Sequence, residues 1–393
     1  MPIARRRASR GVRFRLTLAG WIFLGTSVLV AVTALNSGLA LLFVMFGCML
    51  GALYVSALLS RRMIAAVRVQ RDLPRRCRQN QRVQAGYLLR SVRGGGSCLA
   101  LRVAELGLQE VRLPEACCGY LRADQEFLSR ADMVPRRRGR IRMESLRLST
   151  TFPFGLVRAS RRFDQPASLL VWPARGRLTT ALIGKGASES ASTAPSVRAG
   201  GQDDFYGLRE YRLGDNARWI HWRRSAGRAE PVIREMSRPR PRTLWVALDT
   251  CVPGDGSPAE RARRERSIRF AATLIEEALA AGYRVGAAVA YGRKVVIVPP
   301  AERRSACQRL LDALADIDDN DARHLAETLA HLRQAWVRQA HVVVVSPARH
   351  VDEAGGQPLI RLRRSCRELT VVSGERLGEV FRDDPVAAAQ EGE

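Results

Sequence analysis

Residues 205–228 read FYGLREYRLGDNARWIHWRRSAGR, and this stretch says more about the fold than any other part of the chain. Five aromatic side chains fall within it, although aromatic residues make up only 6% of the sequence. Arginines stand between and after the aromatics, together with the carboxylates of Glu210 and Asp215. Flat apolar rings interleaved with guanidinium groups are typical of a packed polar junction, or of a surface that holds a partner.

The centre of this stretch predicts a short helix closed by local polar contacts. Gly214 permits a turn, after which Asp215 is placed to cap the helix and Arg218 can reach back to that carboxylate. Trp219, Trp222 and Ala226 then fall on one helical face, at i, i+3 and i+7. Two interpretations stay open, because interdomain junctions and interfaces share this composition: a clasp between two domains, or a partner-binding face.

The same stretch resembles the signature of a bacterial family called domain of unknown function 58, roughly R-x-Y-x-x-G-D-x-x-R-x-I-x-W-x-x-S-A. The matching residues are Arg209, Tyr211, Gly214, Asp215, Arg218, Ile220, Trp222, Ser225 and Ala226. A second family motif, T-T-x-P-F-G-L, is matched by Thr150, Thr151, Pro153, Phe154, Gly155 and Leu156. We expect this second motif to turn the chain and to plug an aromatic ring into a β-sandwich.

The resemblance also implies an architecture and likely neighbours for the chain. Members of the family are membrane-anchored and carry a domain similar to the von Willebrand factor A domain. They commonly occur with MoxR-type AAA+ ATPases and with membrane proteins that bear transglutaminase-like domains. The resemblance carries no established chemistry.

A long uncharged run near the N-terminus predicts membrane insertion. No charged residue occurs from Leu16 to Ser60, and one straight helix of that length would measure about 67 Å, more than twice the hydrocarbon thickness. Asn36-Ser37-Gly38 interrupts the run, so we expect two spans, about Leu16–Leu35 and Leu39–Leu59. A cleaved signal peptide would leave the second span unexplained, and a buried hairpin of a soluble domain would keep a polar face.

Arginines on both sides of the run predict its orientation. Arg61 and Arg62 follow it, and six arginines precede it: Arg5, Arg6, Arg7, Arg10, Arg13 and Arg15. By the positive-inside rule both flanks are cytoplasmic. We therefore expect a protein of the inner (cytoplasmic) membrane with two spans and both termini in the cytoplasm.

The formal net charge of +26 comes almost wholly from arginine, since Lys185 and Lys294 are the only lysines. A basic cytosolic part beside anionic lipid gains about 1 kcal/mol of attraction per nearby arginine. Nucleic acid would respond to the same charge, but no nucleic-acid-binding motif of known spacing occurs. The eight cysteines form no C-x-x-C pair and no Cys/His spacing suited to zinc, which indicates reduced thiols in small apolar roles.

Hydrophobic patterning divides the rest of the chain. Short alternating strands such as Ile141–Leu148 predict an all-β, sandwich-like domain, and buried strands at Thr243–Asp249 and His341–Ser346, alternating with helices such as Ala322–Gln339, predict an α/β domain with a mostly parallel sheet. This α/β region resembles the von Willebrand factor A domain. In order, the predicted segments are a basic N-terminus (1–15), two transmembrane helices (16–60), the β-sandwich-like domain (63–175), a flexible linker or loop (176–201), the signature block (202–240), the von Willebrand factor A-like domain (241–380) and a disordered tail (381–393).

The end of the first α/β strand is the candidate metal position. Metal-binding von Willebrand A domains carry D-x-S-x-S there, because hard cations take oxygen ligands. This chain keeps Asp249 but has Cys251 and Pro253 in the serine positions, and Thr250 and Asp255 compensate poorly. We therefore predict no metal or other cofactor, and expect Asp249 to cap the following turn or to pair with an arginine.

Catalysis receives little support from the sequence. Cys251 lies at a strand end, a common place for a nucleophile, but none of the five histidines sits in a recognisable catalytic motif. No phosphate loop of the G-x-x-x-x-G-K-[ST] kind occurs. The favoured hypothesis is a non-enzymatic, membrane-anchored adaptor that binds a protein partner; the alternatives are a Mg²⁺-dependent or Cys251 thiol enzyme, and a nucleic-acid binder using the Arg/Trp block.

Overall fold

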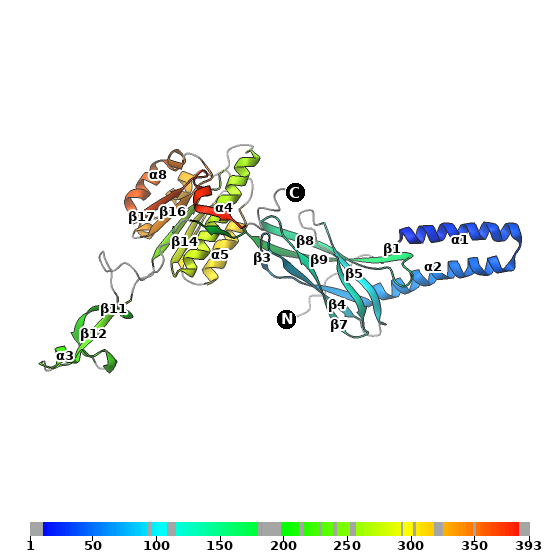
Figure 1. The fold of residues 1–393 in the computed structure, drawn as a ribbon, viewed down its shortest axis with the longest axis horizontal. Helices are drawn as coiled ribbons and strands as arrows, with labels where there is room; N and C mark the ends of the chain where they lie inside the picture. The colour runs from blue at the N-terminus through cyan, green and yellow to red at the C-terminus, as the bar shows by residue number, and fades with distance from the viewer. Residues whose placement is uncertain are drawn as a thin grey trace. The chain divides into compact units, whose positions relative to one another are not determined.

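The computed structural model describes residues 11–92, 96–107, 115–179, 182, 198–212, 215–227, 230–238, 242–251, 257–291, 294–301, 304–317, 325–338, 340–348 and 351–384. The chain divides into two compact units between Ala174 and Arg175 (Figure 1). The first unit holds a helical hairpin and two sheets, and the second holds an α/β sheet and a two-stranded ribbon. Two apolar helices followed by sheet-rich parts agree with the predicted order of elements.

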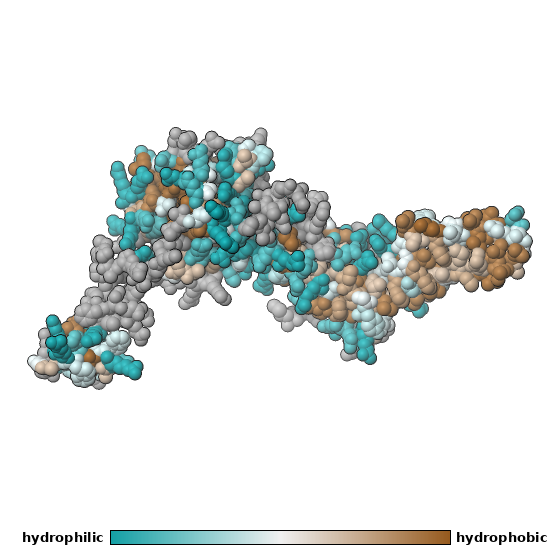
Figure 2. Space-filling model, in the orientation of Figure 1, coloured by the Kyte–Doolittle hydropathy of each residue, from teal (hydrophilic) through white to brown (hydrophobic). Residues whose placement is uncertain are grey.

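The helical hairpin consists of α1 (Leu18–Ser37) and α2 (Ala40–Ala66). The Thr17 hydroxyl caps α1 by accepting from Gly20 N at 3.0 Å, and Gly38 ends the helix in the left-handed region, with φ of 67°. Both helices are long and apolar enough to cross a membrane, and their surface is hydrophobic (Figure 2). The predicted pair of helices is confirmed. However, α2 continues past the predicted end at Leu59, since its last turn packs into the β core.

The buried residues of the two helices recur at regular intervals and are mostly small. They are spaced by seven in α1 and by four in α2, and they are Gly20, Ser27 and Ala34, with Ser56, Ser60 and Ile64. Small residues at such spacings allow two helix backbones to approach closely. Many other apolar residues of the two helices are exposed, and Leu18 and Leu41 are each 79% exposed.

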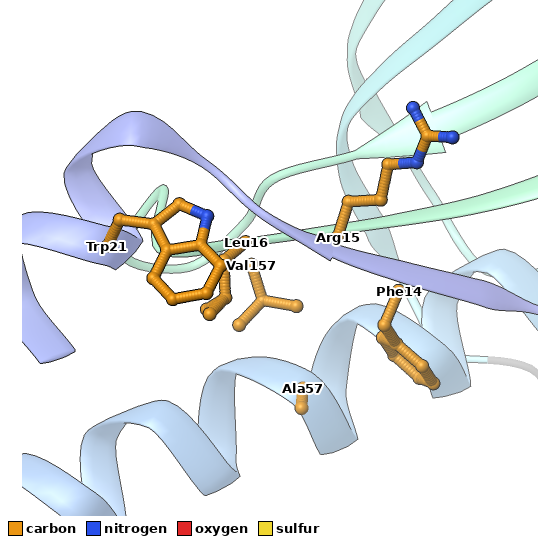
Figure 3. Close-up of a pocket in the computed structure, with 6 residues that line it drawn as sticks. All are labelled: Phe14, Arg15, Leu16, Trp21, Ala57 and Val157. Carbon is orange, nitrogen blue, oxygen red and sulfur yellow. The ribbon is translucent and has the colours of Figure 1, made fainter.

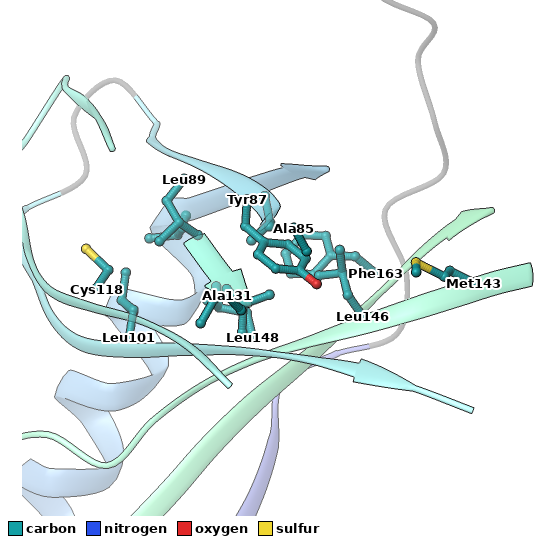
Figure 4. Close-up of a cluster of buried hydrophobic side chains, with 14 of the residues drawn as sticks. Ala85, Tyr87, Leu89, Leu101, Cys118, Ala131, Met143, Leu146, Leu148 and Phe163 are labelled. Atoms are coloured by element: carbon teal, nitrogen blue, oxygen red, sulfur yellow. The ribbon is translucent and has the colours of Figure 1, made fainter. Parts of the chain in front are cut away.

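Two sheets complete the first unit, and all their strands except β1 follow the hairpin in the chain. One has the order β1-β9-β8-β5-β6, with β3 also pairing with β9, and the other has the order β2-β4-β7. The bounds are β1 (Arg13–Leu16), β2 (Val67–Asp72), β3 (Arg76–Arg78), β4 (Val83–Ser91), β5 (Cys98–Leu106), β6 (Ala116–Leu121), β7 (Glu126–Met133), β8 (Gly139–Thr150) and β9 (Val157–Trp172). Apolar side chains from both sheets form one core (Figure 4). Except for β3 with β9, the pairs are antiparallel.

The T-T-x-P-F-G-L turn between β8 and β9 binds the foot of the hairpin. The Ser60 hydroxyl donates to the Phe152 carbonyl at 2.6 Å, and the Thr17 hydroxyl donates to the Gly155 carbonyl at 2.6 Å. A Cβ at Gly20 would overlap the Leu156 carbonyl oxygen, so only glycine permits this approach. The prediction that Phe154 packs into the sandwich is wrong, since this residue is 57% exposed. The turn instead contacts the helices through its backbone carbonyls.

An ion pair lies inside the first unit and joins its two sheets. Arg71 lies on β2, and Glu105 lies on β5 of the other sheet. Arg71 donates through Nε to Glu105 Oε1 at 2.8 Å and through Nη2 to Oε2 at 2.6 Å. The two side chains are only 5% and 1% exposed. Burial, followed by the charge and hydrogen bond of Glu105, raises the pKa of Tyr87, the residue opposite Arg71 on β4.

The second unit is built on a five-stranded sheet with the order β15-β14-β13-β16-β17. Its strands are β13 (Thr243–Leu248), β14 (Arg284–Tyr291), β15 (Lys294–Ala301), β16 (His341–Val345) and β17 (Glu368–Val372). Three neighbouring pairs are parallel, but β14 and β15 are antiparallel, so the sheet is mixed. Only two residues separate Tyr291 from Lys294, which is too short for the crossover that a parallel neighbour needs.

Six helices are described in the second unit's α/β part, and the sequence pattern predicted only some of them. They are α4 (Pro258–Ala280), α5 (Arg304–Ala315), α6 (Leu325–Ala330), α7 (Gln334–Val337), α8 (Val351–Ser365) and α9 (Leu377–Val380). Ser257 and Glu260 form a capping box at the start of α4. The single helix predicted over Ala322–Gln339 is interrupted after Ala330, so its described part forms α6 and α7, and α8 was not predicted.

Two short strands close the second unit and correct two predicted boundaries. Gly176–Leu178 forms β10, inside the predicted linker, and Phe381–Asp383 forms β18, inside the predicted tail. The two pair antiparallel, and Phe381 is fully buried against Phe270 of α4. Most of the remaining linker and tail residues lie outside the described ones.

Candidate functional site

The signature residues lie at the end of a two-stranded ribbon. Strand β11 (Arg198–Glu210) pairs antiparallel with β12 (Val232–Arg238). Between them come a 3-10 turn at Ala217–Trp219 and the short helix α3 (Trp222–Ser225). This intervening segment folds back on the chain, since His221 N donates to the Val232 carbonyl at 2.7 Å and Tyr211 N donates to the Pro231 carbonyl at 2.8 Å.

Asp215 organises the segment through a bidentate ion pair. Arg209 donates through Nη1 to Asp215 Oδ2 at 2.6 Å and through Nη2 to Oδ1 at 2.7 Å, and Arg212 N donates to Oδ2 at 2.8 Å. The predicted partner Arg218 is therefore wrong: its backbone N–H donates to Asn216 Oδ1, which caps the 3-10 turn instead. The hydrogen bonds from Arg209 and then Arg212 N lower the pKa of Asp215 to about 2.

This pKa sets an expected pH dependence for the ribbon end. The carboxyl has a lowered pKa in the folded state, so its stabilisation is present above the reference value of 3.8 and is lost as the pH falls towards 2. We expect 5-fluorotryptophan resonances of Trp219 and Trp222 to shift across this range. Asp215→Asn should abolish that transition, whereas Glu210→Gln should preserve it. An unchanged transition in Asp215→Asn would assign it to another group.

The remaining signature residues divide into internal and exposed ones. The Ser225 hydroxyl accepts from Val232 N at 2.9 Å and donates to the His221 carbonyl at 3.1 Å, which fastens α3 to β12. Ile220 forms an isolated bridge with Ile233, and this extended residue separates Trp219 from Trp222, so the single helical face predicted for both tryptophans is wrong.

Trp222 is exposed, at 69%, and is more exposed than Tyr211 and Trp219. Other exposed residues within 211–227 include Arg218, Arg223, Arg224 and Ala226. Gly214 lies outside the described residues. The structure thus joins Arg209, Tyr211 and Asp215 by hydrogen bonds, with Tyr211 Oη donating to the Asp215 carbonyl at 3.3 Å. Ser225 bonds separately to Val232 and His221.

The second candidate position is the carboxyl edge of the α/β sheet. Strands β14 and β15 lie on one side of β13, and β16 and β17 lie on the other, so the ends of β13 and β16 form a topological switch point. Asp249 follows β13 and Ser346 follows β16, both nearly fully buried. The Ser346 hydroxyl donates to Asp249 Oδ2 at 2.6 Å, and Cys251 N donates to Oδ1 at 3.1 Å.

These contacts give Asp249 a turn-capping role, as predicted. The sequence did not predict that Ser346 bonds to Asp249, because the two residues are brought together only by the pairing of β13 with β16. One carboxylate and nearby hydroxyls make a weak oxygen set for a hard cation. Among the residues that the structure describes, no group of three His, Cys, Asp or Glu side chains could hold a metal ion. Pro253 and Asp255 lie outside them.

Cys251 lies beside Asp249 at this edge of the sheet. Burial, together with the neighbouring Asp249 carboxylate, raises the pKa of the Cys251 thiol and so disfavours the nucleophilic thiolate. His341 lies at the other end of the sheet, opposite Leu244 at the start of β13. Its imidazole contacts the Thr370 hydroxyl at 2.8 Å. His324 and His350 lie outside the described residues.

Comparison with known proteins supports the resemblance found in the signature. The family model described as "Protein of unknown function DUF58" matches residues 207–359, which confirms the family resemblance over these residues. The chain is 26% identical over 141 residues to "Uncharacterized protein Mb1516" of Mycobacterium bovis and to "Uncharacterized protein Rv1480" of Mycobacterium tuberculosis. The aligned region covers 35% of this chain and 44% of each relative, so the chain spans less than half the length of these relatives.

Proposed function

We propose that this chain is a membrane-anchored adaptor without catalytic activity, whose second unit binds a protein partner in the cytosol. Helices α1 and α2 would cross the inner membrane as a hairpin, with both flanks in the cytoplasm. Their length, apolarity and outward-facing side chains support the anchor. The arginines on both flanks support the orientation.

The binding role is supported by the contrast between the internally bonded and the exposed residues of the signature segment. The Arg209–Asp215 pair and Ser225 are engaged internally, while Trp222 remains 69% exposed beside exposed arginines. Tryptophan and arginine are the residue types most enriched at the energetic centres of protein interfaces. A surface held rigidly by an ion pair also loses little conformational entropy on binding.

The partner that we favour is a MoxR-type AAA+ ATPase, with a transglutaminase-like membrane protein as a further member of the assembly. This proposal rests on the family resemblance. A basic, tryptophan-bearing surface would suit an acidic patch on such a partner. We further propose that the α/β part is von Willebrand factor A-like, and the central position of β13, with β14 and β15 on one side and β16 and β17 on the other, supports it.

Trp222→Ala tests this function directly. We expect the variant to weaken binding of a MoxR-type ATPase by about tenfold or more, since truncation of an interface centre costs about 2 kcal/mol or more. Binding is measured by pull-down and titration from detergent extract, with and without ATP. Tyr120→Ala is the matched control, because this aromatic is also exposed, at 55%, but belongs to the first unit.

Two outcomes would contradict the proposal. Recovery of no AAA+ protein in either nucleotide condition would remove the partner. Protease protection that placed the second unit outside the cell would remove the orientation. Calorimetry with Mg²⁺ and labelling with a thiol-directed probe distinguish the adaptor from an enzyme. For the adaptor we expect neither Mg²⁺ binding nor thiol labelling.

A further inference from the structure

A groove lies at the foot of the helical hairpin, where β1, the start of α1 and the side of α2 meet. It has a volume of about 610 Å³ and is lined by Phe14, Arg15, Leu16, Trp21, Ala57 and Val157. Figure 3 shows that these side chains come from the three elements and from the start of β9.

The groove is apolar and continues the outer surface of the hairpin. Phe14 and Trp21 are 44% and 62% exposed, although large aromatic rings are costly to leave in water. Leu18, the first residue of α1, is 79% exposed. Exposed aromatic rings where apolar helices meet a polar domain are typical of the level of lipid headgroups.

Three arginines on β1 and β9 stand beside the groove. The antiparallel register of β1 and β9 places Arg15 directly opposite Arg158, and Arg13 lies two residues along the same face. Like charges in such a cross-strand pair destabilise the sheet unless an anion compensates them. All three side chains are exposed, and none has an ion-pair partner among the residues described for this chain.

We propose that this groove binds an anionic phospholipid of the membrane. One acyl chain would lie against Leu16, Ala57 and Val157, between the two aromatic rings, and the phosphate would bind Arg15 and Arg158. Strand β1 is the edge of its sheet, so a headgroup can reach both guanidinium groups around the open edge. Guanidinium groups bind phosphate oxygens through paired hydrogen bonds. This inference rests on the proposed membrane anchoring.

A lipid fits the site better than a free anion, because the basic pair adjoins a groove whose lining is mostly apolar. The apolar wall is continuous with surface that would face acyl chains in a bilayer. Each arginine near a membrane surface contributes about 1 kcal/mol towards anionic lipid. Loss of both should therefore weaken phosphatidylglycerol binding by about tenfold or more.

Native mass spectrometry of the full chain in neutral detergent tests the headgroup part. The probes are dioleoyl phosphatidylglycerol and dioleoyl phosphatidylcholine. We expect the wild type to retain phosphatidylglycerol preferentially, and Arg15→Gln/Arg158→Gln to lose that preference. The matched control is Arg90→Gln/Arg162→Gln, which removes two exposed arginines that pair with Glu126 and Asp164. Equal retention of both lipids by the wild type, or equal effects of the two double variants, would overturn the proposal.

Two further arms test the groove and the source of the phosphate. Ala57→Phe fills the groove and should reduce retention of both lipids several-fold; unchanged retention would overturn the site. Excess inorganic phosphate should leave the lipid bound, and full displacement would instead indicate a free-anion site. Carbonate extraction of membranes separates the two proposals: a chain that stays in the pellet but shows no lipid preference refutes only the lipid site, whereas a chain that is extracted refutes both.

Discussion

Replacement of Glu105 by leucine is expected to lower the free energy of unfolding of the first unit by about 3–5 kcal/mol. The substitution leaves the Arg71 guanidinium buried, at 5% exposure, without its carboxylate. A charge stranded in the core keeps its desolvation cost after its Coulomb attraction is gone. The loss also removes an ion pair between the two sheets of this unit, which joins β2 to β5.

Hydrogen exchange of β4 and β5 amides in the full chain, in detergent micelles, measures this effect. Glu126→Leu is the matched control, because its pair with Arg90 is 3.3 Å long but solvent-exposed and should contribute less than about 1 kcal/mol. Arg71→Met/Glu105→Leu should recover most of the loss, apart from about 1–2 kcal/mol for the Tyr87 hydroxyl left without its acceptor. Equal destabilisation by the exposed and buried single substitutions would contradict the assignment.

The same ion pair illustrates what the sequence could not predict. Arg71 and Glu105 each stand in an alternating strand, where a charged residue is normally taken to face solvent. Only the packing of two sheets brings them together, and they are separated by 34 positions in the chain. The prediction of Asp215's partner was wrong for a related reason. The local i, i+3 rule favours Arg218, but Arg209, at the end of strand β11, donates to the carboxylate through both Nη1 and Nη2.

Features determined by local chemistry were predicted well. The uncharged run and the Asn36-Ser37-Gly38 break gave two helices, and Gly38 has the positive φ that such a break requires. The continuous apolar runs gave β13 and β16, because strands buried on both faces lack polar alternation. The antiparallel edge strand β15 was also within reach, since the two-residue spacing after Tyr291 excludes a crossover.

Strand β18 was missed because its stabilising contacts come from distant residues. Residues 381–384 are polar apart from Phe381 and too few to show a periodic pattern, so nothing local predicts a strand there. In the fold, its partner strand β10 lies about 200 residues earlier, and α4 supplies the rest of its surroundings. The Asp383 carboxylate pairs with Arg269 Nε at 2.9 Å and with Arg266 Nε at 3.4 Å.

Phe381→Ala is accordingly expected to destabilise the second unit by about 3–5 kcal/mol, the usual cost of truncating a buried phenylalanine. The ring is fully buried and packs edge-on against Phe270, with ring centroids 5.8 Å apart. Its removal leaves a cavity beneath β18 and loosens the Asp383 contacts with α4. Hydrogen exchange of α4 and β13 amides in the full chain should report the loss.

Gly176→Ala approaches the same contact from the opposite strand and separates packing from strand pairing. A Cβ at Gly176 would overlap the Phe381 ring and would lie 2.5 Å from the Arg382 carbonyl oxygen, so β10 and β18 could no longer pair at this register. We expect a loss of at least 1–3 kcal/mol, about the cost of overpacking a core. Gly378→Ala is the control, since its nearest neighbour would be 3.9 Å away and the change should be nearly neutral. If Gly176→Ala and Phe381→Ala behaved like this control, β18 would be a loosely attached end, and α4 with its sheet would account for the stability of the unit alone.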